Sequence, residues 1–581
     1  MRTARTPLRE AVVAILLLSI GVVLDMTSPS AMLGLLGCVG MAGLLLFLVG
    51  EIRLRELLRA GQGLLSLEIG LVVGAAAMFV ARLMRLVEDL EVPAASAAHI
   101  HTVRVYDGTF LGLSIAAIAL HRRLRLSARV LEKLGKRPHL LLSFSFAGMI
   151  GVSTLLLCLP WSVEEPGQMR IVDELFTATS AVCVTGLSVH DVGTHYTAFG
   201  EFVLLLAIQF GGIGIMTLGA LAVALARDSS LVTQAKYAEV FETGTLSELR
   251  GLTRTIVTTT FAIEFAGFVL LWMAWADDPR LEGRSVAWCA AFHSVSAFCN
   301  AGFSTLPRGL MDFSSAYSLQ FVIMGLIVLG GLGFPVYQAM FTRVRERALA
   351  WQRREPTLVR PYDYGSRVVL KATAFLIVGG TVALGLLEYH RAFAGMGFLD
   401  GSMAALFSSV TTRTAGFNTI DFGAMAPPGL LVTMLLMWIG GSPSSTAGGI
   451  KTTAASVLFA NFVGEMRQHP PRLSGRVVAA ESIRRASAVA TLSLASVGLV
   501  VFALTLTETH EILKLAFEAV SALGTVGLST GITPTLSNAG RVILVAAMFI
   551  GRTGPMTAAL AVGARAQREK FRLPENDLQV W

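Results

Sequence analysis

The sequence has few charged residues and few cysteines for its length. Only 15% of its 581 residues are charged, against about 25% in an ordinary soluble protein, while 54% are hydrophobic. The shortage of charge excludes a soluble globular enzyme, and it also excludes a disordered chain. Five cysteines in such a long chain make no disulfide framework. Four lie in apolar stretches without CxxC spacing or histidine partners, and we expect them to serve packing: Cys38, Cys158, Cys289 and Cys299.

Motifs of catalysis and of nucleotide binding are also missing. The chain has no HExxH, no GxSxG with suitable partners and no pair of aspartates within one apolar run. It has no P-loop and no GxGxxG after a strand, so we expect neither an enzyme nor an organic cofactor in this chain.

Long apolar runs are what the sequence has in abundance. A transmembrane helix needs roughly 20 predominantly apolar residues. Twelve runs of about that size lie at residues 11–27, 30–50, 63–83, 103–120, 139–160, 200–226, 253–275, 317–341, 368–388, 429–447, 484–506 and 540–563. The first run follows three arginines, so a cleaved signal peptide is the alternative interpretation of that run.

Basic residues follow the even-numbered runs. They cluster at 122–137, 343–367 and 565–572, whereas the loops after odd-numbered runs are acidic. Because short cytoplasmic loops are enriched in Lys and Arg, we expect a multi-pass protein of the cell (inner) membrane with both termini in the cytoplasm. This asymmetry accounts for the net charge of +8, so the expected partner is the lipid bilayer and not a nucleic acid.

One short segment recurs four times between successive apolar runs. The copies align without gaps at residues 177–188, 293–304, 407–418 and 518–529. Each contains a glycine followed by Leu or Phe, and these glycines, 111 to 116 residues apart, are Gly186, Gly302, Gly416 and Gly527. Each repeat contains two crossings, so all four repeats share one orientation, which favours a central pore over the inverted repeats of many transporters.

The recurring segments have the properties of re-entrant pore loops. About nine residues before each glycine would form a half-helix of roughly 13 Å, too short to cross a bilayer. Irregular backbone at membrane depth must be buried in protein or line an aqueous cavity. Four half-helix C-termini converging on an axis make a cation site, where glycine frees carbonyls to point inward. The alternative is that these glycines only permit close helix packing.

The predicted fold is therefore an all-α membrane protein with four parallel span, pore-loop, span repeats around a pore. The expected organisation is an N-terminal extension with about four transmembrane helices (1–138), repeats at 139–226, 251–341, 366–450 and 482–563, and a cytoplasmic tail (564–581).

At these motifs the sequence resembles the Trk/Ktr/HKT superfamily of potassium transporters. The resemblance rests on TSAVCVTGLS, QFGGIGI, FHSVSAFCNAGFS, TRTAGFNT, GGSPSSTAGGIKTT and FIGRTGP, which span about residues 139–563 in order. It implies K⁺ uptake through one pore in each chain. It also implies a homodimer with a cytoplasmic ring of nucleotide-binding regulatory subunits, for which the basic loops at 341–367 and 464–485 are candidate contacts.

The resemblance also implies which residues form the ion pathway. A selectivity filter of backbone carbonyls is expected from Val184, Thr185, Gly186, Asn300, Ala301, Gly302, Thr414, Ala415, Gly416, Thr525, Val526 and Gly527. Serine at the first of the four glycines is associated in this superfamily with Na⁺ permeation, so Gly186 favours K⁺. A gate below the filter is expected from Gly440, Gly441, Ser442, Pro443, Gly448, Gly449 and Arg552. Residues 442–449 interrupt an apolar run with proline, serine and glycine, so we also expect a broken helix there.

Several ionisable residues lie within the apolar runs or the recurring segments. A charge inside a membrane is costly, so Arg552 is a candidate for function, the alternative being a structural tie to carbonyls of the broken helix. We interpret Arg413 as a structural tie behind its loop and His293 as a local hydrogen-bonding residue. Glu68 and Glu264 either pair with an arginine, are neutral or couple to ions.

Two other functions compete with K⁺ uptake. One is a sodium-permeable or cation-coupled symporter on the same scaffold, which ion-replacement flux would separate. The other is a membrane protein without transport activity, such as an assembly scaffold or an intramembrane enzyme.

Overall fold

The computed structural model describes residues 138–165, 167, 169–225, 246–276, 278–281, 283–353 and 362–554. The predicted N-terminal extension up to residue 137, with its four spans and Glu68, lies outside the described residues. So do Cys38, the basic cluster at 122–137 and the tail at 564–581.

The described chain is almost entirely helical, which confirms the expected fold class at this level. The first half contains α7 (Pro138–Leu157), α8 (Ile171–Val182), α9 (Val192–His195), α10 (Ala198–Leu225), α12 (Leu246–Trp275), η2 (Pro279–Leu281), α13 (Val286–Phe298), η3 (Met311–Phe313), α14 (Tyr317–Leu332) and α15 (Phe334–Arg353). The second half contains α16 (Tyr364–Glu388), α17 (Phe398–Thr411), η4 (Phe422–Ala424), α18 (Pro427–Trp438), α19 (Thr452–Met466), α20 (Ala480–Thr507), α21 (Ile512–Gly524), η5 (Thr533–Thr535) and α22 (Asn538–Thr553). A small antiparallel hairpin of β1 (Arg472–Leu473) and β2 (Arg476–Val477) follows α19.

Local sequence signals set where several helices begin. The Asp363 carboxylate accepts the Ser366 N–H at 3.1 Å and caps α16, and the Ser537 hydroxyl accepts the Gly540 N–H at 3.1 Å and caps α22. Two prolines open α18, where the missing N–H costs no hydrogen bond.

Three helices in the described part of the chain are long and apolar enough to cross a membrane. They are Ile256–Trp275, Tyr364–Glu388 and Ala480–Thr507. A fourth would be the pair α14 and α15, but these helices are bent by 103° at Gly333. The apolar run at 317–341, which we counted as one span, therefore contains a sharp bend. Gly333 has φ +85°, and the Phe334 N–H after it donates to the Ser444 carbonyl at 3.0 Å, so a contact distant in sequence ends α14.

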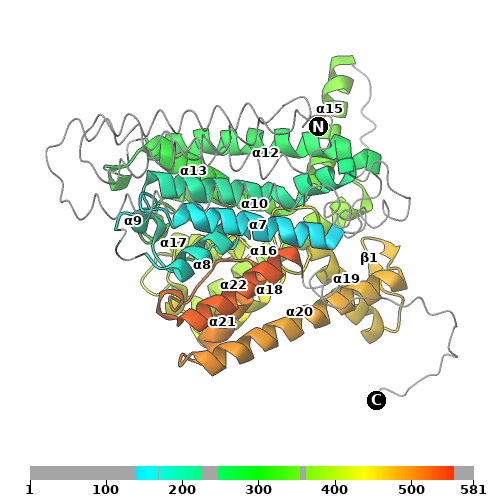
Figure 1. Ribbon diagram of the computed structural model, residues 1–581. Coiled ribbons are helices and arrows are strands. Elements are labelled where there is room, and N and C mark those ends of the chain that lie inside the picture. Colours follow the sequence, from blue (N-terminus) through cyan, green and yellow to red (C-terminus); the bar gives the residue numbers. More distant parts are fainter. Residues whose placement is uncertain are drawn as a thin grey trace, which may run out of the picture.

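The long helices run in broadly similar directions across Figure 1. Helix α9 lies at one end of the molecule, and α15, α19 and the β1–β2 hairpin lie at the other (Figure 1). The basic residues of α15 and those around the hairpin thus share the end opposite to α9. Which end faces the cytoplasm stays a prediction from their charge.

Apolar side chains are exposed along the outer faces of the long helices. On α16 and α20 they recur at helical spacing, as in a helix whose outer face meets lipid. The exposed residues are Phe375, Val378, Val382 and Leu386 on α16, and Leu499, Phe502 and Leu506 on α20.

Candidate ion pathway

The recurring segments lie at the C-terminal ends of four short helices. α8, α13, α17 and α21 contain 12 to 14 residues, about 18–21 Å at 1.5 Å per residue, so they are longer than the nine residues predicted. Each ends three to five residues before its glycine. Each also packs on a helix from another part of the chain: α8 on α22, α13 on α10, α17 on α14 and α21 on α18.

The backbone has the same unusual conformation in all four loops. Two residues before each glycine, a non-glycine residue is left-handed: Val184 (φ 56°), Asn300 (60°), Thr414 (64°) and Thr525 (48°). The four glycines also have positive φ, from 71° to 98°. Left-handed backbone strains an ordinary residue, so its presence at four equivalent positions marks a special conformation that the surroundings maintain.

The four loops meet one another in a closed order. An ideal Cβ placed on Gly302 would lie 2.6 Å from the Ala415 carbonyl oxygen, and one on Gly416 would lie 2.6 Å from that of Val526. A Cβ on Gly527 would collide in the same way with the Thr185 carbonyl, and one on Gly186 with the Ala301 carbonyl, at under 3.0 Å. The residue before each glycine thus presents its carbonyl to the glycine of the preceding loop, and the carbonyl in the first loop faces the fourth, so the order is closed.

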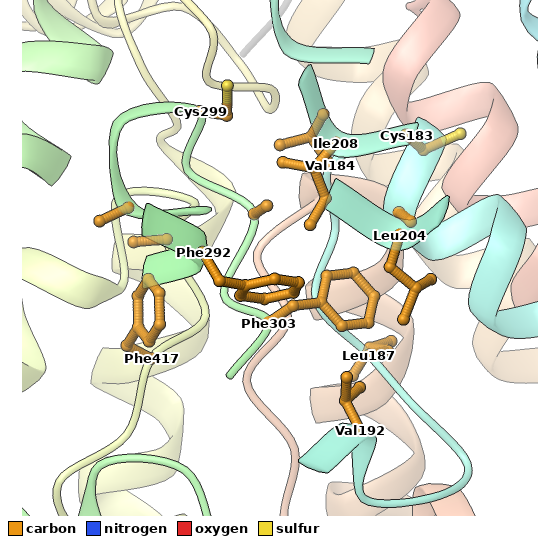
Figure 2. Close-up of a cluster of buried hydrophobic side chains, with 14 of the residues drawn as sticks. Cys183, Val184, Leu187, Val192, Leu204, Ile208, Phe292, Cys299, Phe303 and Phe417 are labelled. Carbon is orange, nitrogen blue, oxygen red and sulfur yellow. The ribbon is translucent and has the colours of Figure 1, made fainter. Parts of the chain in front are cut away.

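The side chains next to these glycines are enclosed by the protein. Thr185, Ala301, Ala415 and Val526 are fully buried. Figure 2 shows Val184 beside Ile208 of α10, and Leu187 near Val192, within the buried hydrophobic cluster. These segments therefore offer their main-chain groups, and also the hydroxyl oxygens of Thr185, Thr414 and Thr525, which are buried and have no hydrogen-bond partner among the described residues.

Hydroxyl groups on the short helices form hydrogen bonds with each loop, and we did not predict this role from the sequence. Ser180 accepts the Gly186 N–H at 3.0 Å, and Ser521 accepts the Gly527 N–H at 3.1 Å. Ser296 donates to the Phe303 carbonyl at 2.8 Å, and Thr411 to that of Phe417 at 2.6 Å. The signal was visible in the alignment, because serine occupies the fourth position of three of the four copies.

The helix that we expect to be broken after the third recurring segment is interrupted in the structure. Helix α18 ends at Trp438, α19 begins at Thr452, and the predicted gate residues from Gly440 to Gly449 lie in the irregular segment between them, which we call the 439–451 loop. The loop doubles back on itself, since the Gly441 N–H donates to the Gly448 carbonyl at 3.2 Å and the Gly440 N–H to that of Ile450 at 3.0 Å.

The 439–451 loop is also bonded to α14 and lies against short helices that carry the recurring segments. The Thr446 hydroxyl donates to the Phe298 carbonyl, at the end of α13, at 3.2 Å, and the Ser442 N–H donates to the Gly331 carbonyl at 3.0 Å. An ideal Cβ on Gly448 would lie 3.1 Å from the carbonyl oxygen of Gly524, at the end of α21. The loop therefore lies directly against two of the four short helices.

Arg552 bridges the 439–451 loop and α10. Its side chain is 5% exposed, and it donates from Nη1 to the Thr446 carbonyl at 2.5 Å and from Nη2 to the Gly211 carbonyl at 2.6 Å. These two hydrogen bonds are the ones expected if Arg552 has a structural role, as a tie to carbonyls of the broken helix. They also place Arg552 on the segment predicted as the gate.

The other ionisable residues have local partners. Arg413 is buried and donates to the Gly440 carbonyl at 3.5 Å, while its own carbonyl accepts from the Asn300 side chain at 3.2 Å. His293 lies within hydrogen-bonding distance of the Cys289 carbonyl and the Ser304 hydroxyl, both at 2.8 Å, which confirms a local hydrogen-bonding role.

Glu264 has a neutral partner, and no arginine among the described residues pairs with it. It lies on α12, where it is buried and accepts from the Gln209 amide at 3.0 Å. The Cys299 thiol lies 3.8 Å from it.

The described cysteines are all free. Cys289 and Cys299 are buried and Cys158 is half-buried, consistent with the packing role predicted for them.

Comparison with known proteins gives the family. The model of the TrkH family, described as a cation transport protein, matches residues 149–571. Ktr system potassium uptake protein B of Bacillus subtilis is 34% identical over 445 residues, which cover 76% of this chain and 96% of that protein. The potassium/sodium uptake protein NtpJ of Enterococcus hirae is 34% identical over 457 residues, which cover 76% of this chain and 97% of that protein.

The fold is likewise similar to a solved structure. The potassium transporter TrkH of Vibrio parahaemolyticus superposes with a TM-score of 0.58 at 16% identity, covering 90% of this chain and 97% of that one. The family and these relatives are transporters, so the expectation that this chain is not an enzyme is confirmed. From the family match, which spans well over half of its length, the chain belongs to the TrkH family of cation transport proteins.

Proposed function

We propose that the chain takes up K⁺ across the cell membrane through a selectivity filter formed by the four loops at Gly186, Gly302, Gly416 and Gly527. The observation that carries this proposal is the closed order of the loops, in which each carbonyl before a glycine faces the glycine of the preceding loop and that of the first loop faces the fourth. The predicted fourfold repeat around a central pore is part of the same proposal. It is supported by the packing of each short helix on a helix from another repeat.

The ion is recognised by main-chain oxygen. A ring of carbonyls replaces the hydration shell of a cation, and here the carbonyls of Thr185, Ala301, Ala415 and Val526 supply one such ring. The four short helices end next to it, and each helix C-terminus adds about half a negative elementary charge. Both effects favour a cation and exclude anions.

Passage is controlled below the filter by the 439–451 loop together with Arg552. The loop is irregular backbone at membrane depth, which is tolerated where it lines a cavity or is buried in protein. Hydrogen bonds from Arg552 hold it against α10. Loss of these bonds would free the loop and remove a positive charge that opposes a passing cation.

A sodium-permeable carrier on the same scaffold is the second candidate. The name of the Enterococcus relative includes sodium, whereas that of the Bacillus relative refers to potassium alone. Glycine at position 186 favours K⁺.

The same family assignment underlies the proposed assembly. We expect a homodimer, with a cytoplasmic ring of nucleotide-binding regulatory subunits that contacts the basic loops at 341–367 and 464–485. Both termini would then face the cytoplasm, and residues 1–138 would form an additional membrane domain.

Flux into vesicles tests the function. The purified chain in proteoliposomes should carry K⁺ or Rb⁺ down a gradient and discriminate against Na⁺. Equal uptake of Na⁺ would favour the sodium-permeable carrier, and no uptake of either ion would refute transport by this chain. Growth of a cell lacking K⁺ uptake at low external K⁺, with and without residues 1–138, measures what the extension contributes.

A further inference from the structure

A fully buried carboxylate lies behind the fourth loop and has no part in the ion ring. Glu518 is on α21, nine residues before Gly527. Its Oε1 accepts from the Ser529 hydroxyl at 2.5 Å and from the Thr530 N–H at 3.2 Å, and its Oε2 accepts from the Thr533 hydroxyl at 3.0 Å. All three donors are neutral, and all three belong to residues that follow Gly527 in the chain.

Such an arrangement costs free energy unless the hydrogen bonds compensate for burial of the charge. Neutral side chains of similar size would fill the same space without this cost. What the carboxylate adds is geometry, because its two oxygens bind three points of the 529–533 segment at once. Charge-assisted hydrogen bonds are also shorter and stronger than neutral ones.

The second loop has the same contact at the equivalent positions. His293 lies nine residues before Gly302, and its Nε2 is 2.8 Å from the hydroxyl of Ser304. The turn that follows is also alike, since Ser304 and Ser529 each accept the N–H two residues further on, at 3.1 and 2.9 Å. The first and third copies have Thr177 and Phe407 there, so an ionisable group occupies this position only in the second and fourth copies.

The 529–533 segment packs against a neighbouring loop, so a change in its position would also affect that loop. An ideal Cβ on Gly423, between α17 and α18, would lie 2.8 Å from the Thr530 carbonyl. On the other side of Gly527, the Val526 carbonyl faces Gly416 of the third loop. A shift at Ser529 would therefore move an oxygen of the proposed ring.

We propose that Glu518 is a positioning residue for ion selectivity, which fixes the exit of the fourth loop and thereby the carbonyls of Thr525 and Val526. This inference rests on the proposed function, in which these carbonyls bind K⁺. Glu518 itself never touches the ion, because it is fully buried behind the loop.

The test compares ion ratios in proteoliposomes that contain the full chain. Glu518→Ala removes the three hydrogen bonds, and Glu518→Gln keeps the length and one acceptor oxygen. The K⁺/Na⁺ flux ratio should fall by about tenfold in Glu518→Ala, which corresponds to about 1.4 kcal/mol of lost discrimination between the two ions. The fall should be smaller in Glu518→Gln. Ser529→Ala, which leaves the carboxylate in place, should lower the ratio in the same direction and carries the test if Glu518→Ala does not fold.

Glu388 offers a matched control. It is also fully buried and also accepts backbone N–H groups, from Ala426 at 3.1 Å and from Ala392 at 3.3 Å, but it lies outside the four loops. Glu388→Gln should leave the ion ratio unchanged. A purely structural role for Glu518 would lower the amount of folded protein and both fluxes together without changing their ratio.

The outcomes separate this inference from the function on which it rests. Wild-type vesicles that do not prefer K⁺ would overturn the filter itself. A wild type that prefers K⁺, with the same ratio in Glu518→Ala and Ser529→Ala, would overturn only the role of Glu518. An equal fall in Glu388→Gln would also overturn it, because any buried carboxylate would then have the same effect.

Discussion

Replacing Gly186 with serine should lower the preference for K⁺ over Na⁺. The added Cβ would lie 3.3 Å from the Gly302 Cα and under 3.0 Å from the Ala301 carbonyl oxygen, closer than real Cβ atoms come. Restoring ordinary contact requires a movement of about 1 Å, which displaces one carbonyl of the proposed ring. The change also places a non-glycine residue at φ +98°, which costs about 1–3 kcal/mol of folding free energy.

The measurement is the ratio of K⁺ to Na⁺ flux in proteoliposomes at equal amounts of folded protein. A fall of about tenfold, or about 1.4 kcal/mol of discrimination, is expected when a filter oxygen is displaced. Gly395→Ser is the matched control, because Gly395 has φ +82° and nothing within 4 Å of its ideal Cβ. It imposes the same backbone strain without a collision, so it should lower stability and leave the ratio unchanged. An unchanged ratio in Gly186→Ser would refute the assignment of this loop to the filter.

Three further predictions concern other parts of the molecule. Arg552→Ala should raise K⁺ flux, because it removes the two hydrogen bonds that hold the 439–451 loop; a folded but slower variant would instead favour a purely structural arginine. Asp173→Asn should lower the free energy of unfolding by about 3 kcal/mol in chemical denaturation, since it leaves the buried Arg541 without its carboxylate partner, and an Arg541→Met background should abolish most of this loss. Burial, and then the charge of the neighbouring His195, lower the pKa of His190, so the folded protein binds this proton less readily than the unfolded chain. Stability should accordingly fall as the pH drops below about 6.5, and His190→Gln should reduce this pH dependence of the melting temperature.

Much of the candidate pathway was predictable because its signals are local. The broken helix at 442–449 follows from proline, serine and glycine inside an apolar run, and the half-helices follow from short segments between longer runs. The left-handed residues were not predicted, since valine and threonine, which occupy three of the four positions, carry no local signal for positive φ. They adopt it in loops that hydroxyl groups of the short helices hold in place.

The sequence by itself determined a cation transport protein of helical membrane type, with four glycine-bearing segments at nearly one spacing and a break in the third repeat. Hydrophobic run length, charge asymmetry and internal repetition depend only on the order of residues along the chain, so they can be read without coordinates. Only the tertiary structure decided that the Ala301 carbonyl faces Gly186, that α14 bends by 103° at Gly333, and that Glu264 pairs with Gln209. Each of these joins groups from different helices, and such contacts depend on how the helices pack and not on the order of residues within any one of them.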